Sequence, residues 1–277
     1  MALPMEFFTA VAVHPFLQYA LAGSLLAALG CGVIGPFVVV RRMSYLAGGV
    51  AHSVLGGMGV AYFLGRDPLW GALIAAVVAA LIIGGARRYV HHDRDTLISA
   101  VWAVGMAVGV LFMARAPGYG TDLLGYLFGD ILLIDPHKLV FLGVLDALAV
   151  CVLLAGYRAF LAVAFDEEFA RVRGLPTGWL EIGLLTLVAL MVVVLVQVVG
   201  LILLIALLTL PAAMAGQHVR TIGAMIPVSM ALGALLSVGG LATAYVYDMP
   251  AGATIILWVA VAYLVSSALS WRRLQGA

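Results

Sequence analysis

Long apolar runs separated by small groups of arginine make up most of this chain, from Pro15 to Leu269. Hydrophobic residues account for 65% of the sequence, charged residues for 10%, and the mean hydropathy is +1.18. Soluble domains carry about 25% charged residues, so this composition excludes them. Every backbone N–H and C=O must be satisfied within a segment that lies in hydrocarbon, and runs of about twenty apolar residues achieve this as helices. We therefore predict an all-α polytopic membrane protein.

About nine transmembrane helices are predicted, forming a single transmembrane domain over residues 1–277. An almost unbroken apolar run from Glu181 to Gly216 leaves one alternative open, a single long tilted helix in place of two spans that turn near Gln197 and Gly200. The predicted spans are 16–40, 46–64, 69–86, 96–114, 139–157, 178–196, 198–216, 222–245 and 252–270.

The basic residues predict an orientation, because cytoplasmic loops of membrane proteins carry an excess of Lys and Arg. With the N-terminus outside and the C-terminus in the cytoplasm, eleven of the fourteen basic residues are cytoplasmic and three, Arg66, Arg115 and Lys138, are not. This count requires Asp122 to Ile134 to form a re-entrant or interfacial helix, since thirteen residues are too few to cross. Met1 to His14 carry no Lys or Arg, so we expect no cleaved signal peptide.

Few polar side chains lie at membrane depth, and each of these is a candidate for a pathway. His52 lies in the middle of a glycine-rich span, Asp146 lies in the fifth span, and Asp130 lies in the short segment before it. Ionisable groups within a membrane are costly and face a partner or a polar pathway, and imidazole is a common ligand of transition metals. The alternatives are close packing for the glycines, a helix cap for Asp130 and a structural helix–helix contact for Asp146. Thr209, two residues before Pro211, is expected to accommodate a bend.

A cytoplasmic loop at about 165–176 predicts a short amphipathic helix. Asp166 is placed to cap it, Glu167 and Glu168 follow in its first turn, Arg171 lies late in it, and Gly174 is placed to end it. Such a helix at the membrane surface is either a docking element or an ordinary interfacial connector.

These segments together resemble the permeases of zinc/manganese-type metal importers of the ATP-binding-cassette (ABC) class. The resemblance runs from about residue 12 to 270 and is carried by the order and spacing of several short segments. They are Arg41 to Leu46 before the glycine-rich helix with His52, Asp95-Thr96, Leu127 to Asp130, Phe165 to Arg171 before Gly174, and Val198 to Ala213.

The resemblance implies a subunit of a bacterial inner membrane that forms a homodimer. It implies two cytoplasmic ATPase subunits, docked on the loop helix through Asp166, Glu167, Glu168 and Arg171, and an extracytoplasmic protein that delivers the metal. The family's pathway aspartate and histidine correspond to Gly48 and His52, so this chain retains only the histidine. The cargo implied is a divalent metal, zinc first, then manganese or ferrous iron.

Other classes of function fit the residues less well. The single lysine, Lys138, follows no glycine-rich loop, so the chain has no P-loop and is not predicted to be an ATPase. A proton-coupled secondary transporter or ion exchanger would use His52 with Asp146 and would need no ATPase. No HExxH or Gly-x-Ser-x-Gly sequence supports an intramembrane protease. The basic residues lie at the ends of spans and form no patch for nucleic acid.

Overall fold

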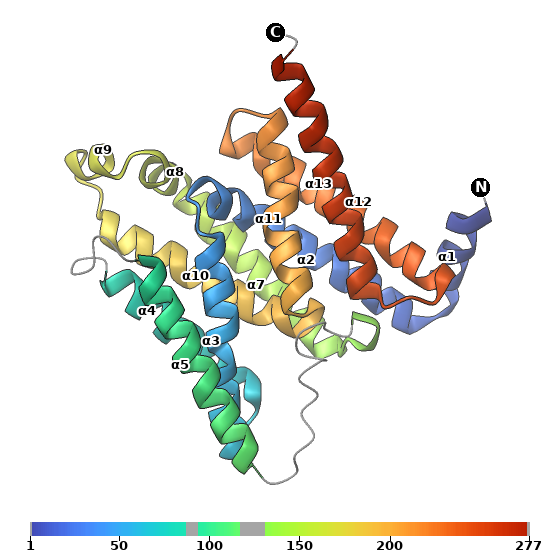
Figure 1. Ribbon diagram of the computed structural model, residues 1–277, viewed down its shortest axis with the longest axis horizontal. Helices are drawn as coiled ribbons and strands as arrows, with labels where there is room; N and C mark the ends of the chain where they lie inside the picture. Colours follow the sequence, from blue (N-terminus) through green and yellow to red (C-terminus); the bar gives the residue numbers. More distant parts are fainter. Residues whose placement is uncertain (1, 87–93, 117–130, 276–277) are drawn as a thin grey trace. The chain divides into compact units, whose positions relative to one another are not determined.

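The computed structural model describes residues 2–86, 94–116 and 131–275, and within these ranges every regular element is helical (Figure 1). The elements are α1 (Ala2–Val13), α2 (Pro15–Val40), α3 (Ser44–Phe63), α4 (Pro68–Ala86), α5 (Arg94–Arg115), the 3₁₀ turn η1 (Ile131–Leu133), α7 (Pro136–Ala155), α8 (Tyr157–Phe165), α9 (Glu167–Val172), α10 (Thr177–Val199), α11 (Leu201–His218), α12 (Ile222–Tyr247) and α13 (Ala251–Gln275).

Nine of the described helices are long and apolar enough to cross a membrane. They are α2, α3, α4, α5, α7, α10, α11, α12 and α13, and each matches a predicted span to within a few residues at either end. The prediction of an all-α polytopic protein with nine spans is therefore confirmed for the described part of the chain.

Gly200 separates α10 from α11. Its backbone has φ 81° and ψ 165°, a conformation that is essentially restricted to glycine. The helix ladder stops at Val199 and starts again at Leu201, so the alternative of one long helix over 181–216 is wrong.

The described helices fall into two compact units. The first contains α1, α2, η1, most of α7, the end of α10, and α11 to α13. Within it, α2 packs against α11 and α12. Gly32 faces Met230 of α12 and Gly35 faces the Leu208 carbonyl of α11, and in both places the backbones approach so closely that a methyl group on the glycine would collide.

Two contacts show that α2 and α7 run in the same direction. A methyl group added at Gly23 would lie 3.2 Å from Leu139, and one added at Gly143 would lie 4.0 Å from Leu26, so residue numbers rise together along the pair. The nine-span count requires this relation, because it makes these helices the first and fifth spans. The predicted re-entrant segment 122–134 lies almost entirely outside the described residues, and only η1 belongs to the described part.

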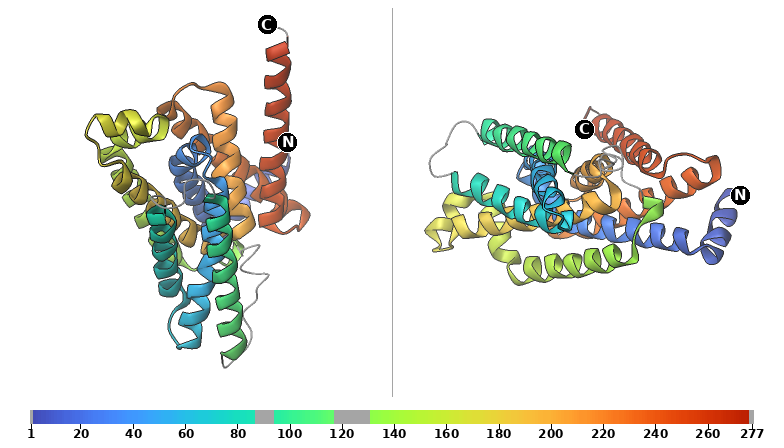
Figure 2. Two further views of the ribbon diagram at one scale, coloured as in Figure 1. Left: turned by 60° about the vertical axis from the view of Figure 1, so that its left-hand side comes forward. Right: turned by 90° about the horizontal axis from the view of Figure 1, so that it is seen from below.

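The second unit contains α3, α4, α5, the end of α7, α8, α9 and most of α10. In it α3 packs against both α4 and α5, and the two views of Figure 2 show α3 beside α5. Added methyl groups at Gly56 and Gly59 would lie 2.7 and 2.6 Å from the carbonyl oxygens of Gly105 and Gly109 on α5. The α3 helix is continuous through these glycines, so they serve close packing and not unwinding.

Helix α8 was not predicted from the sequence. The fifth span was expected to reach residue 157, but α7 ends at Ala155 and a nine-residue helix begins after Gly156. Phe160 and Val163 are buried on one side of α8, whereas its Phe165 end is exposed. The chain then passes directly through Asp166 into α9.

Candidate functional site

One side of α3 carries Tyr45, Gly48 and His52. Tyr45 is exposed, and Gly48 and His52 are half-buried at successive helical turns, while most of the residues between them are buried. We call Tyr45, Gly48 and His52 the His52 face. Packing within the described chain covers this face only in part.

Trp102 of α5 fixes the plane of the His52 ring. The two rings are stacked, with centroids 4.4 Å apart and planes 10° apart. The Trp102 indole N–H points toward Met106 one turn further along α5, with 2.9 Å between Nε1 and Sδ. Aromatic stacking of this kind restricts a side chain without consuming its hydrogen-bonding groups, so the plane of the imidazole is fixed without a hydrogen bond to Trp102.

A hydrogen bond joins the start of α3 to α5 on the same side. The Ser99 hydroxyl donates to the Asp95 carbonyl at 2.7 Å, which leaves its oxygen to accept from the Tyr45 hydroxyl at 2.6 Å. Tyr45 and Trp102 are also in contact, with ring centroids 6.3 Å apart. The His52 face is therefore held at two points by α5.

Among the three residues of this face, His52 supplies the one imidazole, since Gly48 has no side chain and Tyr45 carries a phenol. Its Nδ1 is buried and has no hydrogen-bond partner among the described residues. No group of three or more His, Cys, Asp or Glu able to hold a metal occurs in the described part of the chain. One copy of this face thus offers a single imidazole to a cation, not a closed coordination shell.

The other predicted pathway residues are not brought to His52. Asp146 lies in the first unit on α7, only 7% exposed, and neither carboxylate oxygen has a hydrogen-bond partner among residues 2–86, 94–116 and 131–275. His52 belongs to the second unit, so their pairing stays a prediction. Asp130 lies outside the described residues. The Thr209 hydroxyl donates to the Ile205 carbonyl at 2.7 Å, which supports the expected structural role.

The loop helix has the predicted form. Asp166 caps α9 by accepting a hydrogen bond from the Phe169 N–H at 2.9 Å, Glu167 and Glu168 occupy the first turn, and Arg171 lies in the last. Gly174 follows with φ 79°. Phe169 and Val172 of α9 and Phe165 at the end of α8 are exposed, at 52%, 85% and 65%.

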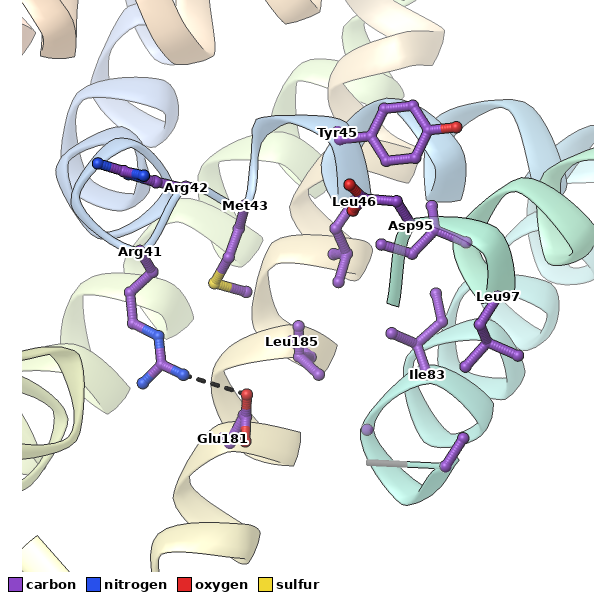
Figure 3. Close-up of a pocket in the computed structure, with 13 residues that line it drawn as sticks. Arg41, Arg42, Met43, Tyr45, Leu46, Ile83, Asp95, Leu97, Glu181 and Leu185 are labelled. Carbon is purple, nitrogen blue, oxygen red and sulfur yellow. Dashed lines mark hydrogen bonds and ion pairs between the residues drawn. The ribbon is translucent and has the colours of Figure 1, made fainter. Parts of the chain in front are cut away.

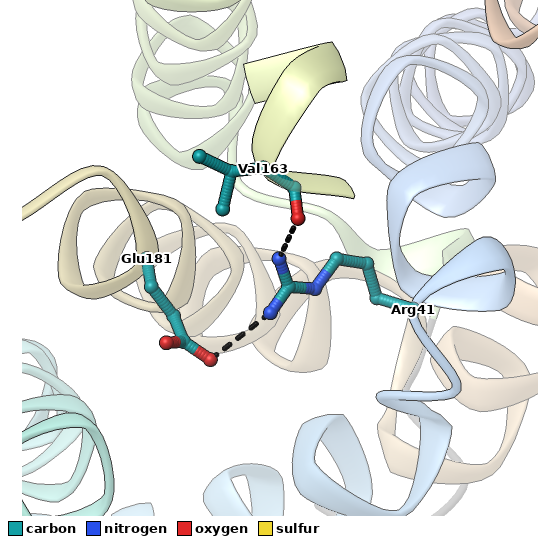
Figure 4. Close-up of polar contacts among 3 residues, drawn as sticks. All are labelled: Arg41, Val163 and Glu181. Atoms are coloured by element: carbon teal, nitrogen blue, oxygen red, sulfur yellow. Dashed lines mark hydrogen bonds and ion pairs between the residues drawn. The ribbon is translucent and has the colours of Figure 1, made fainter. Parts of the chain in front are cut away.

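Arg41 connects three segments at the cytoplasmic end predicted from the arginine distribution. Its Nη1 donates to the Val163 carbonyl of α8 at 2.6 Å, and its Nη2 donates to Glu181 Oε1 of α10 at 3.1 Å (Figure 4). The side chains of Arg41 and Glu181 are 10% and 9% exposed. Burial lowers the pKa of the Arg41 guanidinium, which still remains charged at physiological pH. We call Arg41, Val163 and Glu181 the Arg41 link.

A cavity of about 110 Å³ adjoins the Arg41 link (Figure 3). Its wall comes from the start of α3 and from the ends of α4, α5 and α10 that meet there. Lining residues include Met43, Leu46, Ile83, Asp95, Ile98 and Leu185.

A larger hollow of about 970 Å³ lies along α3 between α4 and α5, and we call it the α4–α5 groove. Ser53, Arg66 and Asp67 are the polar residues of a lining that is otherwise apolar or glycine. Apolar lining residues include Val60, Trp70, Ile74, Val78, Val104 and Val108. Among the described residues that line it, the groove offers no imidazole, thiol or thioether to a transition metal.

Residues 13–270, nearly the whole chain, match the ABC 3 transport family. The chain belongs to this family. It is therefore a multi-pass membrane subunit of an ABC transporter, as the sequence resemblance predicted. ATP hydrolysis belongs to a separate subunit of such a transporter, in agreement with the missing P-loop.

Individual relatives of this ABC 3 permease cover most of its length. A probable metal transport system membrane protein of Chlamydia muridarum is 36% identical over 88% of this chain and 86% of its own. The manganese transport system membrane protein MntC of Halalkalibacterium halodurans is 29% identical over 91% and 86%. Among solved structures, PsaBC from Streptococcus pneumoniae, in complex with Fab, matches with a TM-score of 0.84 at 30% identity over 95% and 94%.

Proposed function

We propose that this ABC 3 permease carries divalent transition-metal ions inward, and that its cargo passes along the His52 face. The observation that carries this proposal is the position of His52, an oriented and half-exposed imidazole in the middle of a membrane span. The names of the relatives, a metal and a manganese transport system protein, support metal as the cargo class.

Zinc is the first candidate metal. Imidazole without a carboxylate suits zinc, whereas manganese prefers carboxylate and carbonyl oxygen. Gly48 removes the carboxylate that the family resemblance places one turn before His52. Manganese, favoured by the name of the MntC relative, comes second, and ferrous iron third.

Two copies of the chain would offer a cation two imidazoles. We propose a homodimer in which the two His52 faces line one passage and form a site weak enough to release its ion. An extracytoplasmic protein would deliver the metal and two cytoplasmic ATPase subunits would drive alternating access.

Helix α9 is the proposed docking element for the ATPase. Its cap and its exposed apolar side form a rigid ridge, and Glu167, Glu168 and Arg171 give it a charge pattern that a partner groove can match. Glu167→Lys with Glu168→Lys is expected to lower ATP-driven uptake at least roughly tenfold while the permease stays inserted. Glu6→Lys, a charge reversal on the exposed part of α1, is the control and should change nothing.

The test is uptake by liposomes that contain the reconstituted permease and ATPase, loaded in turn with zinc, manganese and ferrous iron. We expect uptake that requires ATP and is fastest for zinc. No uptake of any of the three metals would refute metal as cargo. Uptake by the permease without an ATPase subunit would favour the proton-coupled alternative, which membership of the ABC 3 family argues against.

A further inference from the structure

The Arg41 link occupies a particular place along the chain. Arg41 is the first residue of the second unit and lies three residues before α3 begins at Ser44. Val163, which accepts its Nη1 hydrogen bond, lies three residues before Asp166, the cap of α9. A single guanidinium therefore joins the start of the helix that carries His52 to the element that leads into α9.

The end of α8 explains why a cation is held there. The last four carbonyls of a helix have no partner within the helix, and its C-terminus carries partial negative charge. Val163 belongs to this last turn of α8, and the Arg41 guanidinium satisfies its carbonyl. Glu181 of α10 accepts a hydrogen bond from Nη2, the other terminal nitrogen of the same planar guanidinium.

The turn that carries Arg41 is conformationally strained. Arg42 has φ 55°, in the left-handed region that a bulky residue seldom adopts. The Arg42 side chain is exposed, whereas Arg41 is pulled inward by its two acceptors. The cavity beside the link is lined by residues at the start of α3 and on α4 and α10.

Stability alone is a poor explanation for this arrangement. Buried ion pairs are often no more stabilising than a well-packed apolar pair of similar volume. The distinctive property of the Arg41 link is its geometry. One guanidinium is hydrogen-bonded to both α8 and α10, so a movement of either helix acts on Arg41.

We propose that Arg41 is a positioning residue that transmits movement of α9 to α3. A displacement of α9 by its ATPase moves the Val163 carbonyl, and the guanidinium moves the turn before α3 and with it the His52 face. The glycine contacts of α3 with α4 and α5 let this group respond as one body. The inference rests on the proposed docking role of α9.

The test uses Arg41→Lys, Glu181→Gln and the double variant that carries both changes. The control is Arg42→Lys, the same conservative change at the neighbouring exposed residue. Each is reconstituted with the ATPase subunit, and zinc uptake, ATP hydrolysis and the melting temperature are measured. A lysine ammonium has no planar fork and cannot hold both acceptors in this geometry. Arg41→Lys should lower zinc taken up per ATP hydrolysed by roughly tenfold, the effect of losing one hydrogen bond to a charged group.

The remaining variants sharpen the result. Glu181→Gln keeps the hydrogen bond from Arg41 to the Val163 carbonyl. It should therefore lower the zinc taken up per ATP hydrolysed less than Arg41→Lys does. The double variant should be no worse than Arg41→Lys alone, because both changes act through one link. Arg42→Lys should match the wild type in all three measurements. ATP hydrolysis should stay near wild type in all four variants, and the melting temperature should fall where Glu181→Gln removes the charge opposite the buried Arg41 guanidinium.

Two results would overturn the inference. An unchanged ratio in Arg41→Lys would show that the link transmits nothing. A parallel fall of uptake, hydrolysis and melting temperature would show a structural role only. Both outcomes presuppose a wild-type complex that takes up zinc with ATP, so failure of the proposed function would appear separately, as a wild type with no uptake.

Discussion

The two sides of α3 are built from the same glycine-rich sequence but present different chemistry. On the His52 face, Tyr45 and His52 meet Ser99 and Trp102 through a hydrogen bond and a ring stack. On the other side, glycines of α3 pack against the backbones of α4 and α5, and the α4–α5 groove beyond is mostly apolar, with Ser53, Arg66 and Asp67 as its polar lining residues. Close packing on one side and an oriented polar group on the other are separate tasks that one helix performs at different positions.

This difference indicates how a single imidazole can be placed precisely inside a membrane. Backbone contact with α4 and α5 leaves α3 little room to shift, so the stack with Trp102 can fix the ring plane. We expect changes on the His52 face to alter transport without unfolding, and changes on the glycine side to alter folding itself.

The largest effect on transport is expected for His52→Ala. Loss of the imidazole of the His52 face should lower zinc uptake at least roughly 100-fold if imidazole passes the ion along. Uptake into liposomes measures this, and the melting temperature should change little. Normal uptake would return His52 to the status of a packed helix residue.

A large effect on folding is expected for Gly57→Ala. The added methyl group would collide with the Gly71 carbonyl of α4, so the helices must separate, at a cost of about 1–3 kcal/mol. Gly85→Ala is the control, because nothing lies within 4 Å of a methyl group there. A drop in melting temperature for Gly57→Ala alone is the expected result, and equal melting temperatures would contradict the packing role.

A moderate effect is expected when the missing carboxylate is restored. Gly48→Asp places a carboxylate one turn before His52, and hard oxygen ligands favour manganese. The ratio of manganese to zinc uptake should rise several-fold, about what one added ligand contributes. Gly48→Asn is the control, because its side chain has the shape of Asp without the charge, and it should leave the ratio of manganese to zinc uptake near wild type. An equal rise of this ratio in both variants would exclude an effect of the charge.

The smallest effect is expected in the α4–α5 groove. Val104 is 63% exposed and Ile74 is 65% exposed, so truncation of either leaves no buried cavity. Val104→Ala with Ile74→Ala should keep zinc uptake within about twofold of wild type, as for surface substitutions. A loss comparable to that of His52→Ala would mean that the cargo path follows the groove.

The sequence predicted the features that depend on local pattern. Length and hydropathy determine the nine spans, the capping residues Asp166 and Gly174 determine α9, and the break at Gly200 follows from a residue that alone tolerates its backbone angles. Helix α8 was missed because Gly156, in an apolar stretch, looks like any packing glycine within a span.

Contacts between segments that are distant in the sequence could not be predicted from it. The stack of His52 on Trp102 depends on the register of α3 against α5, which no local pattern determines. Arg41 and Glu181 are 140 residues apart, and Arg41 was interpreted as a topology signal and as part of the family resemblance, without a partner. The position of Asp146 relative to His52 stays a prediction, as does the pathway role of Asp130.

The most direct test of the central claim, that cargo passes along the His52 face, is the access of a water-soluble thiol reagent to single cysteines. In a chain with Cys31→Ala and Cys151→Ala, Gly48→Cys reports on this face and Val104→Cys on the groove. In the complex with its ATPase, we predict labelling at Gly48→Cys that zinc slows, and none at Val104→Cys. Labelling confined to Val104→Cys, or labelling at Gly48→Cys that zinc does not affect, would contradict the account.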